Sequence, residues 1–337
     1  MNSSFFGYWD HHLIMVAIWI TLTLSLNLIN GFCGLFSLGH QGFWAIGAYA
    51  AGITVVYSNG SWLGFALSFL AGTLAAGLFG FLVGLPCLRL KGDYLAIATL
   101  GFGEILRNLV QNSQTLGQSL GLQVPNVVRD HTSRNGHACI YLALAFSVAS
   151  LTLVVLRNLI HSAHGRAIQA IRDDERAAEL VGVNLTYYKM LVFTIGAAFA
   201  GLAGAVYANY STLVTPDDYS FNQGVLMVVM VVLGGMGSFG GTILATTVLY
   251  FAPVLLDLWL PLTRIPVFYD PTQGGWVYRE VKELWQVFFA LLLIIVVLLR
   301  PQGIMGNWKF RRKFRGGEPP SPSKPQPEPE RAGGAQP

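Results

Sequence analysis

Charged side chains are scarce in this sequence of 337 residues. Asp, Glu, Lys and Arg together make up 11% of the chain, whereas a soluble domain carries roughly 25%. Hydrophobic residues supply 53%, and the mean hydropathy is +0.52. This composition argues against a soluble globular protein and indicates that lipid is the solvent. We therefore expect an all-α polytopic membrane protein.

Cysteine and the common catalytic motifs are also scarce or absent. The three cysteines, Cys33, Cys87 and Cys139, lie far apart without the spacing of a metal site, so we expect them to be small apolar fillers. The sequence contains no P-loop, no HExxH and no nucleophile elbow. We expect neither an enzyme nor a cofactor, and the net charge of +4 does not suggest a nucleic-acid partner.

The two ends of the chain differ from its middle. Residues 1–12 lack a positively charged region, so we expect a short extracytoplasmic N-terminus and not a cleaved signal peptide. Residues 307–337 are first basic and then rich in proline, with almost no apolar residues after 318, which is typical of a disordered tail. The transmembrane domain is expected to cover residues 13–306.

Long apolar segments fill that domain. A helix needs about 20 apolar residues to cross the hydrocarbon core. Two neighbouring segments are separated only by the letters GGMGSFGG, and another holds Glu104 and Arg107, so we expect eight or nine transmembrane or re-entrant helices. The expected segments are 13–31, 35–57, 62–86, 94–110, 138–160, 189–209, 221–239, 241–260 and 283–299.

Lys and Arg gather in three of the connections. These are 87–93, 157–189 and the stretch that begins at Arg300, and even numbers of expected helices separate them. Basic residues beside membrane spans favour the cytoplasmic side. We therefore expect an outside N-terminus and a cytoplasmic C-terminus.

The connection 161–189 is the longest polar stretch on the basic side. Its pattern predicts a first helix over about 165–172, with Ile168 and Ile171 on one face. Asp173 or Asp174 then offers an N-cap for a second helix of about two turns, which Gly182 would end. So short a helix is not stable alone in water and needs a surface to pack on.

The residues of this second helix leave two interpretations open. Ala177 and Ala178 would let the backbone of a partner come close, while Arg172, Arg176 and Glu179 would fix its register. The helix then couples this chain to another protein. The alternative is a solvated loop between two membrane helices.

A family resemblance favours coupling. Ala177-Ala178 followed by Gly182 resembles the "EAA" coupling segment of ABC importer permeases. The acidic residue lies at Glu175 with Arg176 intervening, a departure that is typical of the branch for branched-chain amino acids. Further stretches between residues 20 and 306 resemble the LivM-type permeases of that branch: NLINGFCGLFSLGHQGFWAIGAYAAG, LRLKGDYLAIATLGFGEILRN, FAGLAGAVYA, VLGGMGSFGGTILA and LLRPQGIMG.

The resemblance implies a permease subunit of an ABC importer for branched-chain amino acids in the bacterial inner membrane. Its partners would be a second, LivH-like permease, two ATP-binding cassette subunits and a periplasmic substrate-binding protein. The residues it assigns to coupling are Asp174, Glu175, Arg176, Ala177, Ala178 and Gly182. Alternatives are a permease for urea or short amides, an ion-coupled secondary transporter and a membrane-embedded enzyme.

Two glycine-rich interruptions share one pattern. Gly34-x-x-Ser37-x-Gly39 recurs as Gly235-x-x-Ser238-x-Gly240. Helices that break at matching places in two halves indicate a translocation path, although close helix packing or chance would also explain the likeness. His40 could hydrogen-bond a solute or satisfy a neighbouring group.

Ionisable residues and glycines inside the spans complete the expected sites. Glu104 and Arg107 would either line the path of a zwitterion or pair with each other near an interface. The glycines at 196, 201 and 204 predict close helix contact. The expected path residues are Ser37, Gly39, His40, Glu104, Arg107, Ser238 and Gly240.

Overall fold

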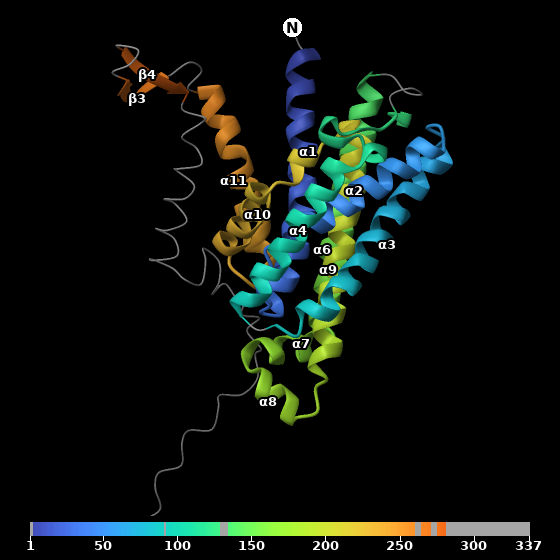
Figure 1. The fold of residues 1–337 in the computed structure, drawn as a ribbon, viewed down its shortest axis with the longest axis vertical. Coiled ribbons are helices and arrows are strands. Elements are labelled where there is room, and N and C mark those ends of the chain that lie inside the picture. Colours follow the sequence, from blue (N-terminus) through green and yellow to red (C-terminus); the bar gives the residue numbers. More distant parts are fainter. Residues whose placement is uncertain (1–2, 91, 129–133, 260–263, 271–274, 281–337) are drawn as a thin grey trace, which may run out of the picture. The chain divides into compact units, whose positions relative to one another are not determined.

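A computed structural model describes residues 3–90, 92–128, 134–259, 264–270 and 275–280. It is built almost wholly of helices, as expected (Figure 1). The expected span 283–299 and the tail 307–337 lie outside the described residues.

Within the described residues, four long apolar helices confirm four of the expected spans. The first is α1 (Ser3–Asn27), which continues into a π-helical turn, η1 (Leu28–Phe32). The parts apolar enough to cross a membrane are Trp9–Phe32, Trp62–Cys87, Gly136–His161 and Leu185–Ser211. The last three belong to α3 (Trp62–Cys87), α6 (Arg134–His161) and α9 (Leu185–Ser211). A further helix, α4 (Asp93–Asn112), covers the expected segment 94–110.

Two expected spans are shorter than predicted. Helix α2 (His40–Tyr57) begins five residues late because residues 34–39 form no helix, and α10 (Phe221–Gly234) stops before 239. With 14 residues α10 is about 21 Å long, less than the roughly 30 Å of the hydrocarbon core. The cause is local: Gly235 and Gly237 have φ values of 101° and 84°, which no helix can include. The chain resumes as α11 (Phe239–Trp259).

Helix α1 lies at the centre of the bundle. It contacts α6, α9, α10 and α11, and 83% of its apolar window is buried. Its apolar side chains therefore pack against protein on all sides, as expected of a helix that is hydrophobic all round. It also carries buried polar side chains near its C-terminal end, including Ser25, Asn27 and, in η1, Asn30.

Helices α2, α3 and α9 pack through glycines. A methyl group at Gly47 of α2 would overlap the backbone of Gly201 in α9, and one at Gly201 would overlap Ala76 of α3. A methyl group at Gly204 would overlap the carbonyl oxygen of Trp44. The expected small-residue face of α9 is therefore a site of close helix contact.

Short elements complete the described chain. The 3-10 turns are η2 (Gln114–Leu116), η3 (Gln118–Leu120) and η4 (Pro216–Tyr219). Strand β1 (Leu122–Gln123) pairs with β2 (Leu213–Val214), and β3 (Arg264–Asp270) pairs with β4 (Gly275–Glu280) as an antiparallel hairpin. The hairpin occupies a connection for which the sequence made no prediction.

Candidate functional site

The polar connection between α6 and α9 folds into the two expected helices. These are α7 (Ala163–Asp173) and α8 (Glu175–Leu180), at one end of the bundle (Figure 1). The side chain of Ser162 caps α7 by accepting from the backbone nitrogen of Gly165 at 3.3 Å. Ile168 and Ile171 are buried, which confirms the predicted inner face of this helix.

Both ends of α8 are set by the residues that predicted them. Oδ1 of Asp174 accepts from the backbone nitrogens of Arg176 and Ala177 at 2.8 and 3.1 Å, so Asp174 is the N-cap. Gly182 has a φ of 86° and donates its backbone N–H to the carbonyl of Glu179 at 3.0 Å. Glycine tolerates this left-handed conformation, so the helix ends after six residues.

The two alanines of α8 do not share a face, contrary to the expectation that both would meet a partner. Ala178 is 2% exposed and faces this chain, where α8 packs on α7 and α9. Ala177 is exposed, and beyond it Leu180 and Val181 are 88% and 78% exposed. The exposed surface of α8 therefore carries the charged Arg176 and Glu179 and ends in an apolar patch, Leu180 and Val181.

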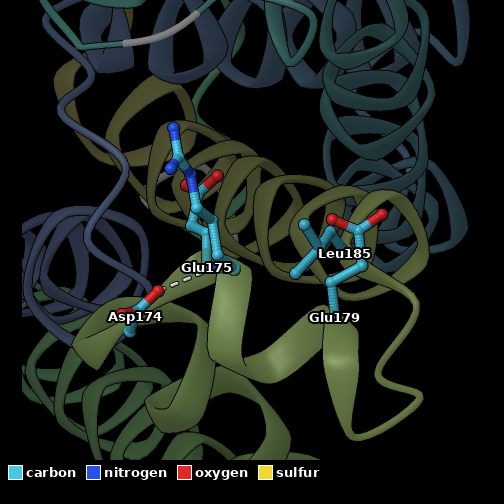
Figure 2. A pocket seen from close by; sticks show the side chains of 5 residues that line it. Asp174, Glu175, Glu179 and Leu185 are labelled. Carbon is cyan, nitrogen blue, oxygen red and sulfur yellow. Dashed lines mark hydrogen bonds between the residues drawn. The ribbon is translucent and has the colours of Figure 1, made fainter.

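An ion pair and an acidic groove lie on the same element. Nζ of Lys189, on α9, is 2.6 Å from Oε1 of Glu175, which ties α8 to the start of a membrane helix. A groove of about 410 Å³ beside this pair is lined by Asp174, Glu175, Arg176, Glu179 and Leu185. Figure 2 shows the carboxylate of Glu179 next to Leu185 in this groove. With three acidic side chains and one arginine, the groove favours a basic group.

Arg172, in the last turn of α7, lies against both glycine interruptions. A methyl group at Gly34 would lie 3.3 Å from its Cγ and 3.6 Å from its Cα, and one at Gly237 would overlap its guanidinium. Sequence reasoning assigned Arg172 to an outside partner. The structure places it between the connecting loop and the two breaks of this chain.

Asparagines of the first membrane helix hold the two breaks together. Oδ1 of Asn27 accepts from the backbone nitrogen of Gly237 at 2.9 Å, and its Nδ2 donates to the carbonyl of Ser238 at 3.2 Å. Asn30 likewise accepts from the backbone nitrogen of Ser37 at 3.1 Å and donates to its carbonyl at 3.2 Å. The prediction missed both asparagines, although amides in an apolar run were a usable signal.

The two breaks lie on the same side of the protein because both contact Arg172. The two glycine interruptions therefore meet the same turn of α7.

The expected path residues of the breaks have different surroundings. Gly39 and Leu38 meet α4, where Leu38 donates its backbone N–H to Oγ1 of Thr99 at 3.1 Å. Ser238 caps α11 by accepting from the backbone nitrogen of Gly241 at 3.2 Å, and Gly240 has open space around it. Nothing close to Gly240 explains a glycine there.

Three of the expected path residues have partners within the chain. Nε2 of His40 lies 2.8 Å from Oγ of Ser25, so this ring nitrogen is satisfied by a neighbour. Glu104 and Arg107 pair with each other at 3.6 Å, and Arg107 also pairs with Asp217 of η4 at 2.8 Å. Asp217 is 110 residues away in the sequence and was not predicted.

These contacts connect an exposed helix to the interior of the bundle. Movement of α8 would pass to α9 through Glu175 and Lys189, and to the breaks through Arg172. Within the described ranges, no group of three His, Cys, Asp or Glu side chains could hold a metal ion.

Comparisons with known proteins agree with this architecture. Residues 9–297 match the family model described as branched-chain amino acid transport system / permease component. The chain is 34% identical to the high-affinity branched-chain amino acid transport system permease protein LivM of Salmonella typhimurium, and the alignment covers 90% of this chain and 71% of that protein. LivM of Escherichia coli gives the same three figures, 34%, 90% and 71%.

A second subunit type is also related. The permease protein LivH of Salmonella typhimurium is 27% identical, over 85% of this chain and 90% of LivH. No solved structure matches the chain. On the strength of the model match and the LivM relatives, this multi-pass membrane protein belongs to the family of branched-chain amino acid transport permeases.

Proposed function

We propose that this chain is the permease subunit of an ATP-driven importer that carries branched-chain amino acids across the bacterial inner membrane. The observation that carries the proposal is α8. Its inner residue, Ala178, is held within the chain, its outer residues Leu180 and Val181 are exposed, and Arg172 connects the same loop to both breaks.

The partner of α8 is one of two ATP-binding cassette subunits. Two adjacent apolar side chains with such high exposure, outside the membrane helices, are typical of a docking surface. The acidic groove beside them adds charge complementarity to a basic group of that partner. A LivH-like permease and a periplasmic substrate-binding protein complete the transporter.

The docking side is the cytoplasmic side. Arg157, Arg166, Arg172, Arg176 and Lys189 all lie on or beside the connection that forms α7 and α8. The positive-inside rule favours the cytoplasm for such a connection, and with it an outside N-terminus and a cytoplasmic C-terminus.

Transport follows from two packing states of the bundle. ATP binding would move the docked subunits and α8 with them, and the ion pair of Glu175 with Lys189 would carry the movement to α9. Arg172 would then shift against Gly34 and Gly237, where the chain carries no side chain that resists the movement. Each partner biases the equilibrium by binding one state better than the other.

The solute is inferred from the names of the relatives. LivM and LivH of Salmonella typhimurium are branched-chain amino acid permeases, and no residue of this chain argues against the same solute. The test is uptake of labelled leucine by the complete transporter in proteoliposomes. We expect uptake to require enclosed ATP and loaded binding protein. Uptake driven by an ion gradient without ATP would contradict the proposal, and uptake of urea alone would change the solute.

Replacing Arg172 with Ala should uncouple leucine uptake from ATP hydrolysis in the transporter. The docked ATPase still turns over, but the breaks lose the side chain that reaches them, so leucine uptake per ATP should fall. Allosteric coupling of this kind is worth about 5- to 150-fold. Uptake and ATP hydrolysis are measured in the same proteoliposomes. Arg166→Ala, on the same helix and exposed, is the matched control and should keep both activities. Equal uptake per ATP in the two variants would contradict this role of Arg172.

A further inference from the structure

Gln41 is a buried amide for which the described residues offer no hydrogen-bond partner. Its side chain is 0% exposed, and neither Nε2 nor Oε1 has a hydrogen-bond partner among the described residues. It lies between two glycines of other helices. A methyl group at Gly103 of α4 would lie 2.9 Å from its Nε2, and one at Gly224 of α10 would overlap its Oε1.

Two more buried polar groups continue from Gln41 toward η4. Trp44 lies three residues further along α2, so its side chain projects from the same helix face. Its ring centroid is 4.7 Å from that of Tyr219, and the two side chains are 4% and 1% exposed. In the part of the chain that the structure describes, Nε1 of Trp44 and the hydroxyl of Tyr219 also have no hydrogen-bond partner.

The third element of this polar region is α4, with the ion-paired residues Glu104 and Arg107. Arg107 lies four residues after Gly103 on α4 and pairs with Asp217, two residues before Tyr219. Of the ten buried side-chain atoms found unpartnered within the described ranges, six belong to these residues: Gln41 with two, Trp44, Glu104, Arg107 and Tyr219. Residues from α2, α4 and η4 thus contribute to one polar region, which is buried at Gln41, Trp44 and Tyr219 and partly exposed at Glu104 and Arg107.

Two other buried amides are satisfied at both ends, while Asn209 is bonded through Nδ2 alone. Asn27 uses both ends of its amide, on Gly237, Ser238 and Thr242, and Asn30 uses both ends on Ser37. An unpaired amide in a membrane protein is costly, and a leucine at position 41 would avoid that cost. Gln41, with neither amide atom paired among the described residues, therefore offers both ends of its amide to a further partner.

We propose that Gln41, Trp44 and Tyr219 form the contact site for the zwitterionic head group of the transported amino acid. This inference rests on the proposed function. The amide of Gln41 can donate to a carboxylate and accept from an ammonium group, the indole N–H donates to the carboxylate, and the tyrosine hydroxyl serves either group. In this structure Gly103 and Gly224 close against the amide, so the site is shut.

The same geometry links the site to the docking loop, the connection 161–189 that forms α7 and α8. Gly224 belongs to α10, and α10 ends at the break that Asn27 holds and Arg172 contacts. A shift of that break moves α10 as a rigid element. Separation of Gly224 from Gln41 opens the amide to solute.

The test replaces Gln41 with Leu in the complete transporter. The solute loses hydrogen bonds to its charged groups, so leucine transported per ATP should fall about 10- to 150-fold. ATP hydrolysis should be unchanged, and the melting temperature of the purified chain should not fall, because the unpaired amide is gone. Gln41→Glu keeps the shape of the side chain and its acceptor oxygen, so the fold should be retained. It loses the N–H donor for the carboxylate of the solute, so transport should fall.

Thr152→Val is the matched control. Thr152 is also 0% exposed, but its hydroxyl donates to the carbonyl of Val148 at 2.8 Å on α6, away from the site. We expect it to keep the wild-type ratio of leucine to ATP. If Gln41→Leu instead melts lower and loses ATP hydrolysis together with transport, Gln41 is structural and the proposal is overturned. If Gln41 pairs only with an ordered water, Gln41→Leu should likewise melt lower and lose ATP hydrolysis together with transport, and that result also overturns the proposal.

Labelling supplies a second measurement that does not depend on the solute. The variant carries Gln41→Cys and, because Cys139 is exposed, also Cys139→Ser. A hydrophilic thiol reagent should label it during ATP turnover, and leucine should slow the labelling. Absence of labelling during active transport overturns the proposal.

The outcomes separate this inference from the proposed function. If the wild type imports leucine and Gln41→Leu does so at the same ratio to ATP, the contact site is wrong and the function stands. If the wild type imports no leucine but another small polar solute, and Gln41→Leu lowers that uptake, the function is wrong and the contact role of Gln41 stands.

Discussion

Replacement of Leu180 with Arg is expected to abolish ATP-driven uptake while the permease stays folded. Leu180 is 88% exposed on the last turn of α8, so the change disturbs no contact within the chain. Burying an unpaired guanidinium in an apolar interface removes a central contact, which costs roughly 30- to 1,000-fold in affinity. Co-purification of the ATPase subunit and leucine uptake in proteoliposomes measure the effect.

Leu120→Arg is the matched control for this prediction. Leu120 is 86% exposed in η3, which belongs to the connection after α4 and not to the docking loop. This variant should bind the ATPase and transport leucine like the wild type. Normal ATPase binding by Leu180→Arg would remove the basis for placing the docking surface on α8.

Replacement of Gly201 with Leu is expected to prevent folding of the bundle. A methyl group there already overlaps Ala76 and the carbonyl oxygen of Gly72, both in α3, and Gly47 of α2 lies against the Gly201 backbone. Overpacking costs about 1–3 kcal/mol where side chains can move, and backbone contacts leave less room to do so. The expected result is loss of monodisperse protein in detergent.

Gly101→Leu tests whether this effect belongs to the site or to the substitution. Gly101 is also helical, in α4, but nothing lies within 4 Å of a methyl group there. It should purify with a melting temperature near that of the wild type. A stable Gly201→Leu variant would show that α2, α3 and α9 do not need their close approach.

Local chemistry made the docking loop predictable from its residues. Asp174 caps α8 and Gly182 ends it because each property depends on neighbours within a few residues. The long helices were predictable for a similar reason, since length and apolar content alone decide whether a segment spans a bilayer. Here the sequence carries the information directly.

Tertiary contacts decided what the sequence could not predict. Whether Ala177 or Ala178 faces inward depends on how α8 lies on α7 and α9, and a six-residue helix has no long apolar stripe to indicate it. The end of α10 was missed because the apolar run continues to the glycines at 234 and 235. The glycine-rich interruption at Gly235 was predicted, but the positive φ values of Gly235 and Gly237, which end α10 there, are seen only in the structure.

The polar interior was the hardest part to predict. Arg107 pairs with a residue 110 positions away, and Gln41 lies between glycines of two different helices. Neither contact has a signal in spacing or composition. Sequence reasoning found Glu104 and Arg107 because charge is rare in a span, but it passed over Gln41, whose neighbours His40 and Gly39 stood out more.

Accessibility of position 180 tests the central claim most directly. The variant carries Leu180→Cys and, because Cys139 is exposed while Cys33 and Cys87 are buried, also Cys139→Ser. A hydrophilic maleimide should label it rapidly in the purified chain and slowly in the assembled, transporting complex. Equally fast labelling in the complete, active transporter would contradict the account, because α8 would then face solvent while the machine runs.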